Sequence, residues 1–395
     1  MTPVNAMPWR IVLAALIGMF ATTSTGSTRS PFLPDIASDL SVSLPAVANL
    51  FGLTAAAWGI SSYLTGYASD RFGRHKFLLY SPLLLCAAMV AVAYVPNYTT
   101  LVCVVIFSGL CCGAYTATAM AEVSIQTPSS HQGRALGYVM TGQSLTLLIG
   151  VPLSAWLGAK TGWRGMHFVL AGLAMFAAIS VYIAVRTQSG DQAPAHKARS
   201  SVPIKEAMTG PVARLFMALV AERLCFGLAT FYYASYLRTE YAMPVNAVAL
   251  PLIGFALGNI SGTFAGGQVA DRFPYRRISY ATAIVIAGCI AVPWFSWRPG
   301  IGVTVTLGIA FAFFNGLARP PLLAALADVP VNVRGVVMGL NSSIASIGWL
   351  AAALIGGWLY AGVGFSGFSP VMAAMCFVAA AVVLPDSRLR QQQRD

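Results

Sequence analysis

Charged residues are scarce in this chain of 395 residues, where Asp, Glu, Lys and Arg together make up 9%. A soluble domain contains roughly 25% charged residues, so this chain cannot cover a water-exposed surface in the usual way. Histidine is also rare, with four residues, and none of the seven cysteines stands at a metal-ligand spacing. The composition therefore excludes an ordinary soluble protein, and it predicts no metal site and no cofactor.

Long apolar segments make up most of the chain instead. Hydrophobic residues account for 57% of the positions, and runs of about 20 apolar residues are long enough to cross a bilayer as helices. The expected fold class is therefore an all-α membrane protein. We expect twelve transmembrane helices, at residues 9–34, 43–66, 77–96, 100–124, 136–158, 165–186, 212–237, 246–268, 278–297, 301–325, 336–360 and 367–385.

The net charge of +12 is explained by membrane topology. Of the 24 Lys and Arg residues, 17 fall in segments that the twelve-helix arrangement places on one side, and four fall on the other. Basic residues in short loops concentrate on the cytoplasmic side of a membrane. We therefore expect a multi-pass protein of the cell membrane, a bacterial inner membrane, with both termini in the cytoplasm. No nucleic-acid partner is expected.

One long polar segment divides the chain near its midpoint. Residues 187–211 contain several Ser and Ala residues, three Pro and few large apolar residues, which is typical of a linker. The sequence thus predicts a bundle of six helices over residues 1–186, a cytoplasmic linker, and a second six-helix bundle over residues 212–395.

A charged loop appears once in each predicted bundle. The first copy reads Asp70-Arg71-Phe72-Gly73-Arg74, and the second, about 200 residues later, reads Asp271-Arg272-Phe273-Pro274-Tyr275-Arg276. Two homologous membrane halves are typical of transporters in which one half moves against the other around a central site. The loop resembles the one between the second and third helices of the Major Facilitator Superfamily. The resemblance implies a secondary active transporter with two pseudo-symmetric six-helix bundles, which we expect to act as a monomer.

The resemblance also implies a conformational gate at the cytoplasmic ends of the helices. In the family, a loop aspartate, a loop arginine and an acidic residue of the fourth helix form a charge relay that stabilises the outward-facing state. For Glu122 the alternative is binding of a proton or of the substrate. The residues that match the gate, or its equivalent in the second half, are Asp70, Arg71, Arg74, Glu122, Asp271, Arg272, Arg276 and Asp328.

Few ionisable residues remain inside the predicted membrane helices. Glu222 and Arg223 lie near the middle of the seventh helix, where a charge costs at least about 2.5–3.5 kcal/mol. We therefore expect them to serve transport, although a structural pairing with another helix is the alternative. Adjacent helical residues point about 100° apart, so one is expected to line a cavity while the other packs. Arg29 and Arg319 are also candidates for the translocation path, as partners of a carboxylate or phosphate group of the substrate. They lie nearer the helix ends, and the alternative is that they snorkel toward the headgroups.

Polar and aromatic residues complete the candidate translocation path. Residues 22–30 contain eight hydrogen-bonding residues out of nine, which favours a water-facing wall, or else hydroxyls bonded back to their own helix. Phe226 and Tyr233 are interpreted as part of an amphipathic pocket or as interfacial anchors. The buried amides provide either substrate contacts or bonds between helices, and these amides are Gln143, Asn259, Asn315 and Asn341.

The fifth helix resembles that of the drug:proton antiporters within the superfamily, and so does the end of the first helix at residues 31–37. Gly142 and Gly150 would allow close helix contact, and Pro152 would bend the helix. Two positions depart from the pattern of the proton-coupled members. An arginine of the fourth helix would fall near Val105, and an acidic residue of the first helix would fall near Ser27. If protons are coupled, Glu222 is the best remaining carrier.

Two functions are compatible with these residues. The first is proton-coupled export of small amphipathic organic molecules across the cytoplasmic membrane. The alternative is uptake or exchange of a small organic anion or metabolite that pairs with the intramembrane arginines. No nucleophile, metal or cofactor constellation appears, so we do not expect an enzyme. The expected partners are the small-molecule substrate, protons and the lipid bilayer.

Overall fold

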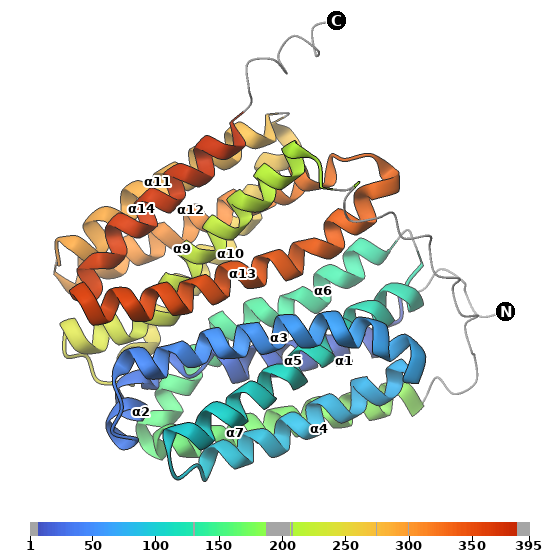
Figure 1. Cartoon of the computed structure of the whole chain (residues 1–395), viewed down its shortest axis with the longest axis horizontal. Coiled ribbons are helices and arrows are strands. Elements are labelled where there is room, and N and C mark those ends of the chain that lie inside the picture. Colours follow the sequence, from blue (N-terminus) through green and yellow to red (C-terminus); the bar gives the residue numbers. More distant parts are fainter. Residues whose placement is uncertain are drawn as a thin grey trace, which may run out of the picture. The chain divides into compact units, whose positions relative to one another are not determined.

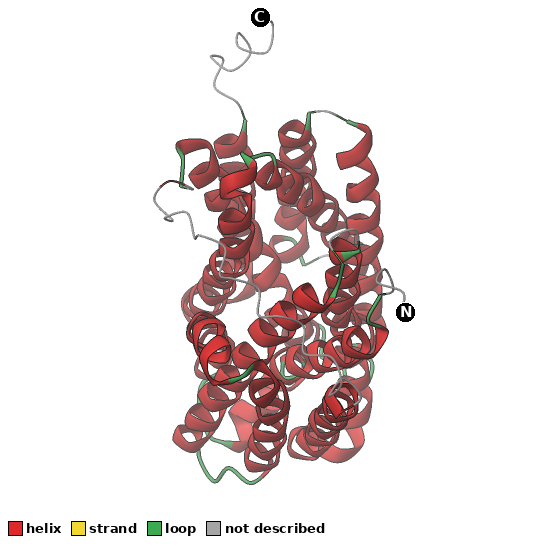
Figure 2. Ribbon diagram, turned by 90° about the vertical axis from the view of Figure 1, so that its right-hand side faces the viewer, coloured by secondary structure: helices red, strands yellow, loops and turns green. Residues whose placement is uncertain are grey.

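A computed structural model describes residues 7–128, 131–186, 206, 208–273, 275–298 and 300–384. In these ranges every regular element is a helix, as Figures 1 and 2 show. Contacts divide the chain into two compact units. Unit 1 comprises Met1–Arg199 and Leu237–Leu252, and unit 2 comprises Ser200–Tyr236 and Ile253–Asp395. Most of the expected linker at residues 187–211 lies outside the described residues.

Unit 1 contains the helices of the first half of the chain. The helices α1 and α6 pack together, α3 packs on α5, and α4 packs on α7. Their bounds are α1 (Trp9–Ser27), η1 (Ser30–Phe32), α2 (Leu33–Asp39), α3 (Leu44–Phe72), α4 (Arg74–Ala93), α5 (Tyr98–Gln126), α6 (Gln132–Leu145), η2 (Thr146–Gly150) and α7 (Val151–Arg186).

Unit 2 is built from the helices of the second half, although the end of α9 belongs to unit 1 by its contacts. Within it, α11 packs against both α12 and α14. The bounds are α9 (Gly210–Glu240), α10 (Ala249–Arg272), α11 (Arg276–Ser296), α12 (Ile301–Ala327), α13 (Val331–Val363), η3 (Gly364–Gly367) and α14 (Phe368–Val383).

The helices account for the expected membrane passes. Nine stretches within the described ranges are long and apolar enough to cross a bilayer. Two of them, Arg134–Arg186 and Ser343–Val383, each contain two of the expected passes. Each is broken by a glycine with positive φ, which is Gly162 at 69° in the first and Gly364 at 70° in the second. The helix α9 is the remaining pass, and its charged pair at Glu222 and Arg223 interrupts the apolar sequence.

Glycines allow the helices of each unit to approach closely. In unit 1, a Cβ added at Gly109 of α5 would lie 2.7 Å from the carbonyl oxygen of Thr54 on α3. In unit 2, Gly254, Gly258, Gly262 and Gly266 recur every fourth residue of α10, and each faces α12. A Cβ at Gly258 would lie 2.5 Å from the carbonyl oxygen of Ile309. Small residues at this spacing are typical of membrane helix contacts.

Candidate functional site

The first charged loop places its cations beside Glu122 on α5. Arg74 Nη1 lies 3.9 Å from Glu122 Oε2, and His75 Nε2 lies 3.2 Å from Glu122 Oε1. Gln126, one turn further along α5, donates its amide to the same carboxylate at 2.6 Å. Arg71 is exposed and stacks on the Phe72 ring at 5.6 Å. The side chain of Asp70 lies outside the described part of the structure.

The second charged loop forms the equivalent contact in unit 2. Arg276 Nη1 lies 2.6 Å from Asp328 Oδ2, at the end of α12. Asp271 and Arg272 are both exposed, and neither makes an ion pair with another residue that the structure describes. In each unit, therefore, the last arginine of the charged loop meets an acidic residue near the end of a neighbouring helix. Their gating role remains a prediction.

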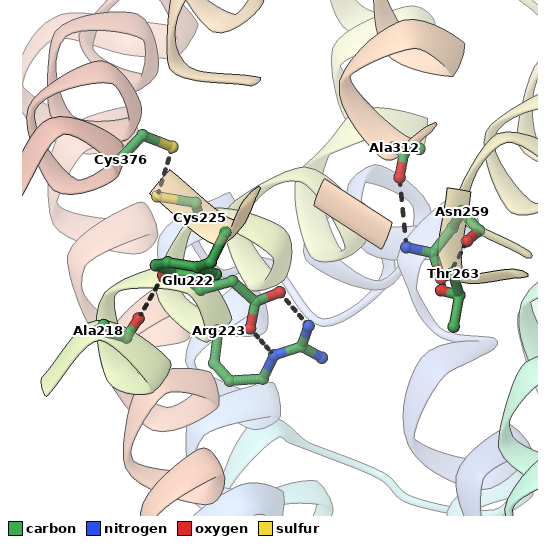
Figure 3. A network of polar contacts seen from close by, with 9 residues as sticks. Ala218, Glu222, Arg223, Cys225, Asn259, Thr263, Ala312 and Cys376 are labelled. Carbon is green, nitrogen blue, oxygen red and sulfur yellow. Dashed lines mark hydrogen bonds and ion pairs between the residues drawn. The ribbon is translucent and has the colours of Figure 1, made fainter. Parts of the chain in front are cut away.

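Glu222 and Arg223 pair with each other inside α9. Arg223 donates from Nε and Nη2 to the two carboxylate oxygens of Glu222, so the contact is bidentate (Figure 3). The Glu222 side chain is 0% exposed and that of Arg223 is 3% exposed. The expectation that neighbouring side chains diverge is therefore wrong here, because the long Arg223 side chain turns back along the helix. Gly348 of α13 makes room, since a Cβ there would lie 2.5 Å from Arg223 Cβ.

Aromatic rings surround this ion pair. The Arg223 guanidinium lies 5.1 Å from the centroid of Phe226 and 5.8 Å from that of Trp349. Phe226 stacks on Phe255 at 5.8 Å, and Phe255 contacts Tyr233 at 5.6 Å. Phe226 and Tyr233 are both buried, so neither is an interfacial anchor. We call Phe226, Tyr233, Phe255 and Trp349 the aromatic cluster. It gives the ion pair an apolar, polarisable surrounding.

The remaining candidates of α12 and α13 are Arg319, Asn315 and Asn341. Arg319 is half-buried. Asn315, one turn before it on α12, is fully buried, and neither its amide nitrogen nor its oxygen has a hydrogen-bond partner in the described residues. The side-chain oxygen of Asn341 is also buried and has no hydrogen-bond partner in the described residues.

The other two amides differ from each other. Asn259 donates to the carbonyl oxygen of Ala312 at 3.4 Å, which joins α10 to α12 (Figure 3). This contact between helices is one of the two roles expected for these amides. Gln143 on α6 is half-buried.

Arg29 lies inside unit 1 and does not snorkel. It is 3% exposed, follows the end of α1, and donates from Nη2 to Thr54 Oγ1 on α3 at 2.8 Å. Its guanidinium carbon lies 5.7 Å from the centre of the Phe51 ring. The alternative position near the headgroups is not the one observed, because α3 folds over the end of α1 and covers the side chain.

The polar run of α1 is buried. The hydroxyls of Thr22, Thr25 and Thr28 donate to carbonyl oxygens of their own helix at 2.7–2.9 Å. Thr23 and Ser24 also contact the Thr146 hydroxyl, at 2.6 and 3.2 Å. These bonds replace the expected water-facing wall, because most of the hydroxyls are satisfied by α1 itself or by η2.

The glycines of the fifth expected pass lie against α1. A Cβ at Gly142 would lie 2.5 Å from the carbonyl oxygen of Leu16, and one at Gly150 would lie 2.9 Å from Ser24 Oγ. The backbone forms a π-helical turn at η2, directly before the buried Pro152. A π-turn relaxes the regular ladder of the helix, so this pass changes its hydrogen-bonding pattern where proline removes a donor.

Several contacts were not foreseen from the sequence. His75 and Gln126 join the carboxylate of Glu122, and Trp349 joins the aromatic cluster. The sulfur atoms of Cys225 and Cys376 lie 3.7 Å apart between α9 and α14 (Figure 3). A helical position alone does not indicate which residue of a distant helix it meets. Only His75, adjacent to the charged loop, carried a signal in the sequence.

The two helical units, their membrane-length apolar helices and the repeated charged loops define a polytopic membrane transporter. Comparison with known sequences gives the family. The sequence profile of the Major Facilitator Superfamily matches residues 15–342 and, in a second match, residues 215–394. The chain belongs to this superfamily.

Similar proteins include transporters of inner membranes and resistance proteins. The "Inner membrane transport protein YdhP" of Escherichia coli (strain K12) is 25% identical over 368 residues, which cover 92% of each chain. The "Multidrug resistance protein MdtG" of Escherichia coli (strain SMS-3-5 / SECEC) is 26% identical, over 97% of this chain and 93% of the other. The "Chloramphenicol resistance protein" of Streptomyces lividans is 24% identical, over 89% and 90%.

A solved structure has the same fold. It is a bacterial homologue of the human lysosomal transporter Spinster, in an inward-facing and occupied conformation. The TM-score is 0.78 with 13% sequence identity, over 96% of this chain and 97% of the other. This likeness concerns the fold.

Proposed function

We propose that this transporter exports small amphipathic organic molecules from the cytoplasm and couples their export to the entry of protons. The names of the chloramphenicol and multidrug resistance proteins support the substrate class. The observation that carries the proposal is the ion pair of Glu222 and Arg223, buried beside the aromatic cluster. Both termini lie in the cytoplasm in this proposal, because the basic loop residues concentrate on that side.

The ion pair supplies a chemical basis for proton coupling. The carboxylate of Glu222 accepts two bonds from Arg223, so a proton and the guanidinium compete for the same oxygen atoms. Protonation makes Glu222 a neutral acid and leaves the charge of Arg223 without compensation. Loss of the proton restores a neutral pair. The net charge beside the aromatic cluster therefore alternates between +1 and zero.

Because of this alternation, simultaneous binding of a proton and of a cationic or neutral amphipathic molecule is unfavourable. When Glu222 carries a proton, the uncompensated Arg223 repels a cation and draws polar groups toward itself. When the pair is neutral, the apolar faces of Phe226 and Trp349 favour an amphipathic molecule. Exclusive occupancy by proton or substrate is the requirement for antiport.

The two equivalent ion pairs at the charged loops serve the change of conformation. Arg74 with Glu122, and Arg276 with Asp328, each join the start of one helix to the end of another. Their exposure differs, since Glu122 is buried and Asp328 is exposed. We propose that these contacts set the populations of the transport states and do not bind the substrate.

Everted membrane vesicles test the export proposal. With chloramphenicol as the probe, wild-type vesicles should accumulate it when a proton gradient is imposed, and its addition should dissipate the gradient. Glu222→Gln should abolish gradient-driven accumulation and weaken chloramphenicol binding, because a neutral amide mimics the protonated acid and leaves the charge of Arg223 uncompensated. Glu206→Gln, at an exposed glutamate, is the matched control and should behave like the wild type.

Two outcomes contradict the proposal. If Glu222→Gln accumulates chloramphenicol at the wild-type rate, normalised to the amount of folded protein, the ion pair is structural. If wild-type accumulation does not respond to the proton gradient, coupling to protons is wrong.

Exchange or uptake of a small organic anion is the second candidate function. Arg29 favours it, because this buried cation has no carboxylate partner among the described residues. Saturable uptake of a carboxylate into right-side-out vesicles, without movement of chloramphenicol, would select this function over export.

A further inference from the structure

Five arginines of the described residues form an ion pair with an acidic side chain, and Arg29 does not. Those arginines form the pairs Arg74–Glu122, Arg164–Asp39, Arg223–Glu222, Arg238–Asp35 and Arg276–Asp328. Arg29 is as buried as Arg223, yet no carboxylate of the described residues reaches it. A cation buried to this degree normally requires a counter-charge.

The hydrogen bonds of Arg29 leave most of its donors unused. Thr54 Oγ1 donates to the carbonyl oxygen of Leu50 at 2.7 Å, so it serves as an acceptor for Arg29 Nη2 at 2.8 Å. Nε and Nη1 are buried and have no partner in the described residues. A guanidinium has five N–H donors in a planar fork. Thr54 holds one of them and fixes the orientation of the others.

The surroundings of Arg29 restrict the charge and shape of a ligand that can bind there. The Phe51 ring lies 5.7 Å from the guanidinium and offers an apolar face beside it. A lipid headgroup that remains in the bilayer does not reach a side chain that is 3% exposed. One positive charge is balanced by one negative charge, so a monoanion suits the site better than a phosphate dianion. Planar carboxylates match the planar fork of an arginine.

We propose that Arg29 binds the carboxylate of the transported molecule, with Thr54 as a positioning residue and Phe51 against the apolar part of the ligand. The substrate class is a small monocarboxylic acid with an apolar body. This inference rests on the second candidate function, transport of a small organic anion, and names the substrate class for it. It does not depend on the direction of transport or on proton coupling.

Ligand binding to the purified protein in detergent, without any gradient, tests the assignment. The probes are benzoate and its uncharged analogue benzamide, each titrated calorimetrically in the same sodium chloride buffer. The wild type should bind benzoate at least about tenfold more tightly, since hydrogen bonds to a charged group are worth about 1.5–3 kcal/mol. Arg29→Gln should remove the preference. Arg29→Lys should keep part of it, because the charge remains while the fork is lost.

Matched variants separate binding from folding. Arg10→Gln makes the same change at an exposed arginine and should leave the preference unchanged. Without ligand, Arg29→Gln should unfold at a higher temperature than the wild type, because the variant no longer buries an uncompensated charge. A residue with a purely structural role would give the opposite shift.

The assignment is wrong if the wild type binds benzoate no better than benzamide, or if Arg29→Gln retains the preference. It is also wrong if Arg319→Gln, and not Arg29→Gln, removes the preference, since the carboxylate would then bind in unit 2. Competition by chloride that abolishes the preference at equal concentration would identify a simple halide site and overturn the substrate assignment. Absence of proton-driven export together with a retained benzoate preference would contradict the export proposal alone.

Discussion

Removing one partner of the Glu222–Arg223 pair should destabilise the protein far more than removing both. Glu222→Gln leaves the Arg223 guanidinium, 3% exposed, without its counter-charge, and Arg223→Gln leaves the fully buried carboxylate of Glu222 in the same state. Breaking a buried ion pair from one side costs about 3–5 kcal/mol. The double variant places two neutral amides there, so we expect it to lie within about 2 kcal/mol of the wild type.

The two single variants should also differ from each other. Arg223 contacts the rings of Phe226 and Trp349, so Arg223→Gln loses these cation–π contacts in addition to the ion pair. Such contacts contribute about 2 kcal/mol when they are desolvated. Arg223→Gln should therefore be less stable than Glu222→Gln by roughly that amount.

Unfolding by sodium dodecyl sulfate in mixed micelles, followed by tryptophan fluorescence, measures these free energies of unfolding. Glu206→Gln, at an exposed position, sets the baseline for a loss of one carboxylate. Single-variant effects that add up to the double-variant effect within about 0.5 kcal/mol would refute the reasoning, because independent sites behave in this way. The two side chains would then not be coupled despite their contact.

Three further predictions concern the gate, the topology and the helix packing. Asp70→Asn and Arg74→Ala should each slow turnover while leaving the chloramphenicol dissociation constant nearly unchanged, and a large loss of affinity would place these residues in the binding site. Cysteine labelling should reach residues 187–211 and both termini from the cytoplasm, and labelling of this segment from the periplasm would contradict the arrangement of two bundles. Gly258→Ala should be less stable than Gly267→Ala, its control on the same helix, by about 1–3 kcal/mol in detergent unfolding, because a Cβ meets the Ile309 carbonyl only at the first position.

The helices could be predicted from the sequence because each apolar run must satisfy its own backbone hydrogen bonds in the bilayer. The expected helix at residues 100–124, for example, is α5, Tyr98–Gln126. Glu222 and Arg223 were selected for their position near the middle of a helix, and both side chains are buried.

What lay beyond prediction was the direction and the contacts of individual side chains. Arg29 stands near a helix end in the sequence, and only the packing of Thr54 and Phe51 from α3 makes it a buried cation. Arg223 turns back onto its own neighbour because Gly348, on a helix more than 100 residues away, leaves space for it. Such contacts depend on tertiary packing, for which the spacing of residues along one helix carries no signal.

The seam between α10 and α12 has a mechanical consequence. At Gly258, Gly262 and Gly266 the backbone of α10 faces carbonyl oxygens of α12 directly, with no side chain between them. At these three contacts a change of side-chain rotamer cannot absorb a shift of α10 toward α12. The two backbones should therefore move together there. Because α10 ends in the charged loop at Asp271, and Asn315 and Arg319 lie on α12, these two side chains should move with that loop.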